Sequence, residues 1–81
     1  MDYEWDPAKA DLNCEKHRVD FADAVGVSED DWALTLREDV VSGEQHLATV
    51  GTDFLGRVPV VIYTYRGENM RIISARAATK T

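Results

Sequence analysis

The chain has 81 residues, of which 9 are Lys or Arg and 15 are Asp or Glu, so its net charge is -6 at pH 7. A chain of this length holds one small core, and we expect a single domain over residues 1–81. The negative net charge argues against general nucleic-acid binding. The charge is uneven, however, because residues 54–81 carry one acid and five bases, which favours a polar, directional binding surface.

The cysteine content and the apolar runs bear on the compartment. The single cysteine, Cys14, excludes an internal disulfide and fits a reducing environment. The acidic amino terminus lacks the apolar run of a signal peptide, and the longest apolar run, residues 58–63, is too short to cross a bilayer. We therefore expect a cytoplasmic protein with no membrane association.

Two helices are predicted in the amino-terminal third. Asp6 is a suitable N-cap and Pro7 fits the first helical position, so "AKADLNCEKH" is expected to be helical. A second, short helix is expected after Asp20, through "FADAV". Helical spacing assigns to one polar face of the first helix Lys9, Asn13, Lys16 and His17.

Four strands are predicted from Trp32 onward. "WALTLR" alternates apolar and polar residues, as is typical of a half-buried strand, and both Trp5 and Trp32 are expected in the core. The other strands are expected at "EQHLATVG", "RVPVVIYTY" and "MRIISAR". The predicted fold class is α+β, with two N-terminal helices followed by a four-stranded antiparallel β-meander and a helix packed on one face.

Turn lengths predict the strand register. A two-residue turn at residues 67–68 pairs Thr64 with Arg71, and the preceding loop places Glu44 opposite Thr64. These three side chains would form a row on one face of the sheet. Arg71 and Arg76 would point to opposite faces of a regular strand, so both could reach one phosphate only through a bulge or near an open edge. The same registers pair Ile62 with Ile73, Val60 with Ala75, and His46 with Ile62.

The stretch "WDPAKADLNCEKHRVDFADA" resembles the amino-terminal signature of the BrnT toxin family. Short pieces then follow in the family's order: "GE" at 43–44, "TVG" at 49–51, "GR" at 56–57, "YT" with "RG" at 63–67, and "RIISAR" at 71–76. The resemblance implies a bacterial ribonuclease toxin of a type II toxin–antitoxin system, with a RelE-like fold and no metal or organic cofactor. It further implies an RNA substrate, free or on ribosomes, a BrnA-type antitoxin partner, and contact with DNA only through the antitoxin complex.

Metal-free RNA cleavage needs a base for the 2′-hydroxyl, an acid for the 5′-oxygen and a fixed cation for the phosphate. The catalytic candidates are Glu44 and His46 for proton transfer, and Arg71 and Arg76 for the phosphate. Each has a structural alternative: Glu44 and Arg71 could form a plain cross-strand ion pair, and His46 could be a satisfied strand residue. In relatives, arginine usually stands at position 46.

A second set of residues is predicted to bind the RNA itself. The candidates are Lys16, His17, Arg57, Thr64 and Tyr63. Guanidinium and ammonium groups bind backbone phosphates, and a strand tyrosine can stack on a base. The alternatives are ion pairing for Lys16 and His17, a solvated charge for Arg57, and a core position for Tyr63.

The carboxyl terminus leaves a second interpretation open. After "ISAR", relatives continue into a basic helix, whereas this chain reads "AATKT", so we expect that helix to be truncated or absent. Together with His46, the short tail favours a rival hypothesis, in which the protein is a catalytically degenerate toxin fold that acts only as an antitoxin-binding module.

Overall fold

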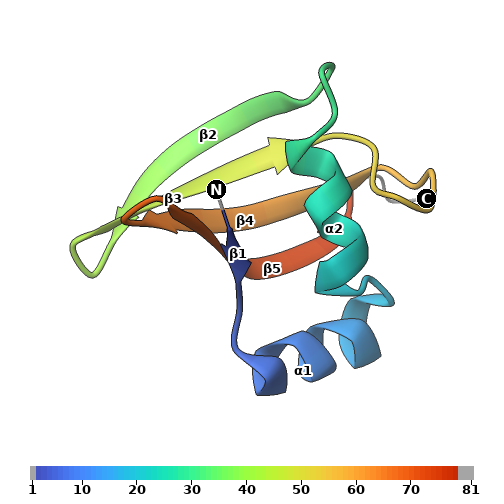
Figure 1. The fold of residues 1–81 in the computed structure, drawn as a ribbon, viewed down its shortest axis with the longest axis horizontal. Coiled ribbons are helices and arrows are strands. Elements are labelled where there is room, and N and C mark those ends of the chain that lie inside the picture. The colour runs from blue at the N-terminus through green and yellow to red at the C-terminus, as the bar shows by residue number, and fades with distance from the viewer. Residues whose placement is uncertain (1, 79–81) are drawn as a thin grey trace.

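The computed structural model describes residues 2–78, which form two helices and a five-stranded sheet. Along the chain the elements are β1 (Tyr3–Glu4), α1 (Pro7–His17), α2 (Phe21–Ser28), β2 (Leu34–Val41), β3 (Glu44–Val50), β4 (Pro59–Arg66) and β5 (Asn69–Ala77) (Figure 1). In space the strand order is β1-β5-β4-β3-β2. The predicted α+β class with two amino-terminal helices is confirmed.

The predicted four-stranded meander lacks one strand. β1 pairs in parallel with β5, with Tyr3 beside Met70 and Glu4 beside Arg71, so the sheet is five-stranded and mixed. Two residues are too few to show an alternating pattern, and the sequence therefore gave no periodic signal for β1. The remaining pairs, β2 with β3, β3 with β4, and β4 with β5, are antiparallel as predicted.

Both helices begin where the sequence indicates. Asp6 and Asp20 each accept a hydrogen bond from the backbone amide two residues further on, at 2.9 Å, which satisfies a free donor of the first turn. Pro7 occupies the start of α1, and the helix ends at His17, followed by the C-cap residue Arg18, whose φ of 61° is left-handed. No helix within residues 2–78 is long and apolar enough to cross a membrane.

The core lies between α2 and the strands β4 and β5. Phe21 of α2 and Val61 of β4 are completely buried, and Trp5 packs its ring edge against Phe21 with the centroids 6.1 Å apart. Trp32, by contrast, is 89% exposed, so the prediction that both tryptophans are buried is wrong for Trp32. Figure 1 shows the reason: α2 crosses β4 and β5, while β2 lies at the far edge of the sheet.

The same geometry corrects the prediction of a half-buried strand after Trp32. All eight residues of β2 are exposed, because the helices pack against β4 and β5 and leave the outer strand uncovered. Alternation in the sequence therefore identified a strand correctly but misjudged its burial.

Asn13 is buried rather than on a solvated helix face. Its amide nitrogen donates to the carbonyl oxygens of Val19, at 3.0 Å, and Ala75, at 2.8 Å. Its side-chain oxygen accepts from the backbone amide of Ala75 at 3.1 Å. Asn13 thus binds the free edge of β5 as a neighbouring strand would, and it fixes α1 there.

The registers differ from prediction on both sides of β4. Thr64 pairs with Arg71 as expected, but Ile73 is an extra residue in β5, so Ile62 faces Ser74 and Val60 faces Arg76. On the other side Leu47 pairs with Tyr63. Continuing that register brings Glu44 beside Arg66, two residues beyond the predicted Thr64.

The extra residue in β5 changes which side chains share a face. Met70, Ile72 and Ala75 are buried in the core, so Arg71 and Arg76 both point to the other side of the sheet. Arg71 and Arg76 would point to opposite faces only if β5 were regular, and the bulge at Ile73 makes it irregular. The predicted loss of a carboxyl-terminal helix concerns residues 79–81, which lie outside the described residues.

Candidate active site

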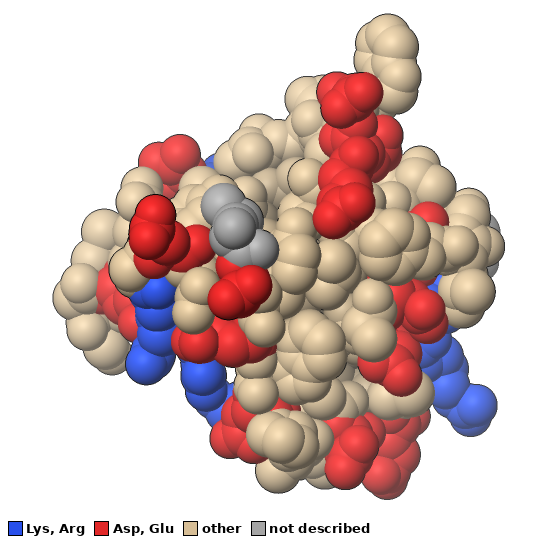
Figure 2. All heavy atoms as spheres, viewed as in Figure 1, with Lys and Arg blue, Asp and Glu red and all other residues tan. Residues whose placement is uncertain are grey.

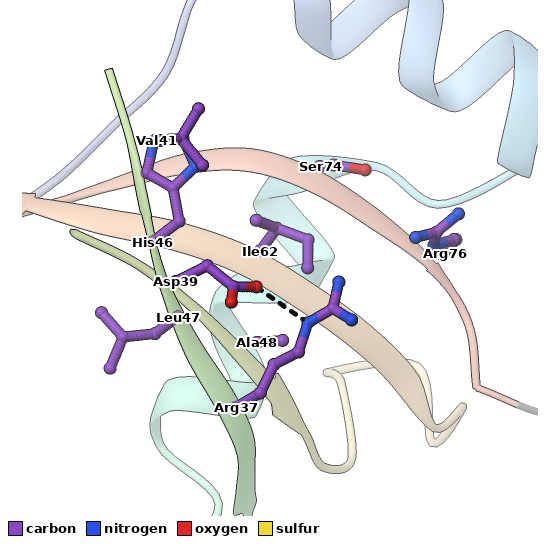
Figure 3. A pocket seen from close by; sticks show the side chains of 9 residues that line it. All are labelled: Arg37, Asp39, Val41, His46, Leu47, Ala48, Ile62, Ser74 and Arg76. Atoms are coloured by element: carbon purple, nitrogen blue, oxygen red, sulfur yellow. Dashed lines mark ion pairs between the residues drawn. The ribbon is translucent and has the colours of Figure 1, made fainter. Parts of the chain in front are cut away.

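A groove lies on the face of the sheet opposite the core, which we call the open face. One hollow of about 250 Å³ is lined by groups from β2, β3, β4 and β5, among them Arg37, Asp39, His46, Ile62, Ser74 and Arg76 (Figure 3). A second hollow of about 360 Å³ shares Arg37, Ile62 and Arg76 with the first and continues toward Ala77. Together they form a groove whose floor is apolar and whose walls are charged.

An imidazole held by a carboxylate forms one wall. The Nε2 atom of His46 lies 3.1 Å from Oε1 of Glu44, and the His46 side chain is 20% exposed. The other carboxylate oxygen of Glu44 lies 3.4 Å from a guanidinium nitrogen of Arg66. Glu44 is therefore fixed from two sides and can orient the His46 ring.

The second wall comes from β2. Asp39 stands opposite His46 in the β2–β3 pair, and its carboxylate lies 3.2 Å from Nε of Arg37. More than half of each side chain is exposed, so this ion pair contributes little to stability and can open at small cost. Neither residue is among the candidates predicted from the sequence. The two-residue turn at 42–43 held the signal, because it places Asp39 opposite His46.

Arg76 differs from the other arginines of the open face. It is exposed, and among residues 2–78 no carboxylate forms an ion pair with it. In Figure 3 the guanidinium groups of Arg76 and Arg37 come from β5 and β2 and lie toward one end of the hollow, with His46 toward the other. A polyanion in the groove would meet two guanidinium groups at one end and an imidazole at the other.

Arg71 is on the same face but does not line the groove. A guanidinium nitrogen lies 3.5 Å from Oε1 of Glu4, its neighbour across the β1–β5 pair. Five residues of strand place the backbones of Arg71 and Arg76 roughly 15 Å apart, and of the two only Arg76 lines the groove. The arginines at the two ends of β5 therefore have different surroundings.

Comparisons with known proteins identify the family of the chain. A family model described as the ribonuclease toxin BrnT of type II toxin–antitoxin systems matches residues 5–81. The chain belongs to the BrnT family. The crystal structure of the Brucella abortus ribonuclease toxin BrnT is similar at 26% identity and a TM-score of 0.75, over 99% of each chain. No curated protein matches the chain. The likeness to RelE-type toxins stays a prediction.

Two other residues predicted to bind RNA in this BrnT-family chain have internal partners. Nε of Arg57 lies 3.0 Å from Oδ2 of Asp53, and its NH1 group donates to the carbonyl oxygen of Arg18 at 2.7 Å. Tyr63 is buried in the core, where its hydroxyl lies 2.9 Å from Oγ1 of Thr49. Neither side chain reaches the groove.

The remaining candidates also lie outside the groove. Thr64 is fully buried, and its hydroxyl donates to the carbonyl oxygen of Gln45 at 2.6 Å. Lys16 is exposed at the end of α1. His17 lines a separate cavity of about 630 Å³ with Val58. Within residues 2–78 no three His, Cys, Asp or Glu side chains converge as metal ligands would. Of the residues predicted from the sequence, the groove brings together His46 and Arg76, and Glu44 contacts His46 from behind.

Proposed function

We propose that this BrnT-family toxin cleaves RNA with its own side chains, without a metal ion, in the groove of the open face. One observation carries the proposal: an exposed arginine, Arg76, and an imidazole held by a carboxylate, His46, line the same hollow. Arg37, at the same end as Arg76, adds a second cation. This set supplies the proton acceptor and the positive charge that the reaction requires.

The groups have separate roles in the proposed reaction. His46 accepts the proton of the 2′-hydroxyl, whose oxygen then forms a bond to phosphorus, while the bond from phosphorus to the 5′-oxygen breaks. The 5′-oxygen leaves with a proton from solvent, which reaches the exposed groove. Arg76, joined by Arg37 once it releases Asp39, binds the phosphate oxygens on which negative charge gathers. Glu44 keeps the His46 ring oriented through the reaction.

The biological context follows from family membership. A type II toxin is paired with an antitoxin, and we propose a BrnA-type protein in that role, together with RNA in the cytoplasm as the target. Cleavage of that RNA would inhibit translation. DNA contact is assigned to the antitoxin complex, because the chain alone is acidic.

Cleavage of RNA by the purified protein in the presence of EDTA tests this function. We expect wild-type protein to cut, and the variants Arg76→Ala and His46→Ala each to cut about 100-fold more slowly. Lys9→Ala removes an exposed cation on α1 and serves as the control with unchanged activity. Equal rates for all four proteins would overturn the proposed site, and a strict requirement for added Mg²⁺ would overturn metal independence.

The degenerate-toxin hypothesis remains a second candidate, favoured by the histidine at a position where the resembled family usually has arginine. It predicts that wild-type protein binds an antitoxin but does not cut RNA. The variant His46→Arg separates the two hypotheses. Activity gained in this variant supports degeneracy, whereas activity lost supports His46 as the proton-transfer group.

A further inference from the structure

The two edges of the sheet differ in whether their backbone groups have partners. At the β5 edge, β1 pairs with Met70 and Arg71, and the Asn13 side chain binds the backbone of Ala75. At the opposite edge, β2 pairs with β3 and with no other strand of residues 2–78, and all eight of its residues are exposed. A long exposed edge presents backbone donors and acceptors to which a further strand can pair.

Apolar side chains follow this free edge. Trp32, in the turn that precedes β2, is 89% exposed, and within β2 Leu36 is 58% and Val40 76% exposed. Scattered apolar residues on a surface need no explanation, but large ones gathered on an unpaired strand and the turn leading into it indicate a surface that is covered by another chain. A tryptophan is also the residue most often found at the energetic centre of a protein interface.

The charges on β2 give little protection against pairing. Arg37 and Asp39 neutralise each other at 3.2 Å, and Glu38 accepts a hydrogen bond from Gln45 at 2.8 Å. The strand contains no proline. Its bulge lies between Thr35 and Arg37, and from Arg37 to Val41 the pairing with β3 is regular. An added strand would therefore meet a regular edge over that length.

The acidic residues beside β2 indicate which kind of chain can pair with its free edge. Glu29, Asp30 and Asp31 directly precede Trp32, and Figure 2 shows acidic side chains gathered where this loop leaves α2. This acidic tip repels RNA. A second copy of the chain, with a net charge of -6, would bring the same acids to the same edge. A basic partner is attracted instead.

We propose that β2 receives an extended, apolar and basic segment of the antitoxin as an additional strand, with Trp32 as its anchor. The inference rests on the antitoxin partner named in the proposed function. It also explains inhibition, because Leu36 and Arg37 of β2 line the groove of the open face. A segment paired to β2 lies at the rim of the groove, and the chain that continues from it covers Arg37 and blocks entry of RNA.

Titration calorimetry of the toxin with its purified cognate BrnA-type antitoxin tests the surface. Trp32→Ala removes the anchor, and Val40→Lys places a charge on the edge outside the groove. We expect each to raise Kd about 10-fold or more while RNA cleavage is unchanged. Leu12→Lys, at a site on α1 that is 64% exposed, is the matched control and should bind as wild type does.

Trp32 fluorescence provides a second readout that does not depend on a variant's folding. Antitoxin binding should shift the emission of wild-type protein to the blue as the indole leaves water, and Trp32→Phe should lack the shift. Wild-type Kd in both edge variants, or no spectral shift, would overturn the proposal. Sedimentation of wild-type toxin as a dimer that Val40→Lys dissociates would assign the edge to a second copy instead.

The docking proposal and the catalytic proposal can fail separately. Wild-type toxin could fail to cut RNA yet show the blue shift of Trp32 emission, with both edge variants losing affinity for the antitoxin. That result would support the β2 surface and overturn the nuclease site. If wild-type toxin cuts RNA and both edge variants remain fully inhibited by the antitoxin, the β2 surface falls and the nuclease site stands.

Discussion

The contact between His46 and Glu44 fixes one wall of the groove. It joins Nε2 and Oε1 at 3.1 Å, and Arg66 holds Glu44 from the other side at 3.4 Å. A carboxylate partner of this kind fixes the ring and stabilises the imidazolium that forms when the ring takes a proton. In the proposed reaction Glu44 is a positioning residue, because it would act on the substrate through His46.

Replacement of Glu44 by glutamine tests this assignment. The amide can keep a hydrogen bond but not the charge, so we expect kcat for RNA cleavage to fall about 10-fold, a fraction of the contribution of His46 itself, with KM unchanged. Arg66→Gln leaves the carboxylate beside His46 and should have a smaller effect. An equal rise in KM for both variants would instead indicate that Glu44 and Arg66 act in RNA binding.

At the scale of elements, one buried polar side chain, Asn13, links α1 to β5. Asn13 makes hydrogen bonds to Val19 and to both backbone groups of Ala75. Because these backbone groups are buried, removing the amide leaves them without partners. We expect Asn13→Ala to lower the free energy of unfolding by about 3 kcal/mol, measured by urea denaturation. Leu12→Ala, at an exposed neighbouring position, should change it by less than about 0.5 kcal/mol.

The loop between α2 and β2 is held by Asp30. Its carboxylate accepts hydrogen bonds from the backbone amides of Thr52, at 2.8 Å, and Trp32, at 3.0 Å. These bonds, the one from Thr52 first, lower the pKa of Asp30 below its ordinary value of 3.8. A lowered pKa in the folded state means that the stabilisation is complete above pH 3.8 and is lost as the pH falls through the lowered pKa.

Asp30→Asn should therefore unfold at lower urea concentration than wild type at neutral pH, and the two proteins should converge in strong acid. Urea midpoints measured across the pH range from neutral to strongly acidic check this. Asp31→Asn, at the exposed neighbouring position, is the control and should follow wild type throughout. A difference for Asp30→Asn that persists at the lowest pH would exclude the carboxylate charge as its source.

Local sequence signals predicted where helices and strands lie better than they predicted the register and burial of those elements. Asp6 and Pro7 predict the start of α1 correctly, because helix capping depends on a few neighbouring residues. The bulge at Ile73 has no comparable local signature, yet it brings Arg76 to the face that carries His46. The exposure of Trp32 follows from where the helices stop, a tertiary property that alternation along β2 does not encode.

The whole molecule separates its charges by region. Acidic side chains gather over the helices and the loop after α2, on the face seen in Figure 2, and the groove carries Arg37 and Arg76 on the open face. The net charge of -6 repels RNA at long range, whereas Arg37 and Arg76 of the proposed site would attract a phosphate at contact distance. Salt weakens both effects, so the salt dependence of the wild-type rate alone does not report on the groove.

The difference in salt dependence between wild type and Arg76→Ala isolates the contact of Arg76 with a phosphate. Long-range repulsion is nearly the same in wild type and Arg76→Ala, while a phosphate contact to single-stranded RNA contributes a slope of about -0.7 to the logarithm of the association constant against the logarithm of salt concentration. We expect the logarithm of kcat/KM for RNA cleavage, plotted against the logarithm of salt concentration, to have a slope shallower by about 0.7 in Arg76→Ala than in wild type. Arg71→Ala is the matched control: because Arg71 is paired with Glu4 and lies outside the groove, its slope should equal that of wild type. A reduced slope in Arg71→Ala with none in Arg76→Ala would move the phosphate site to the other end of β5.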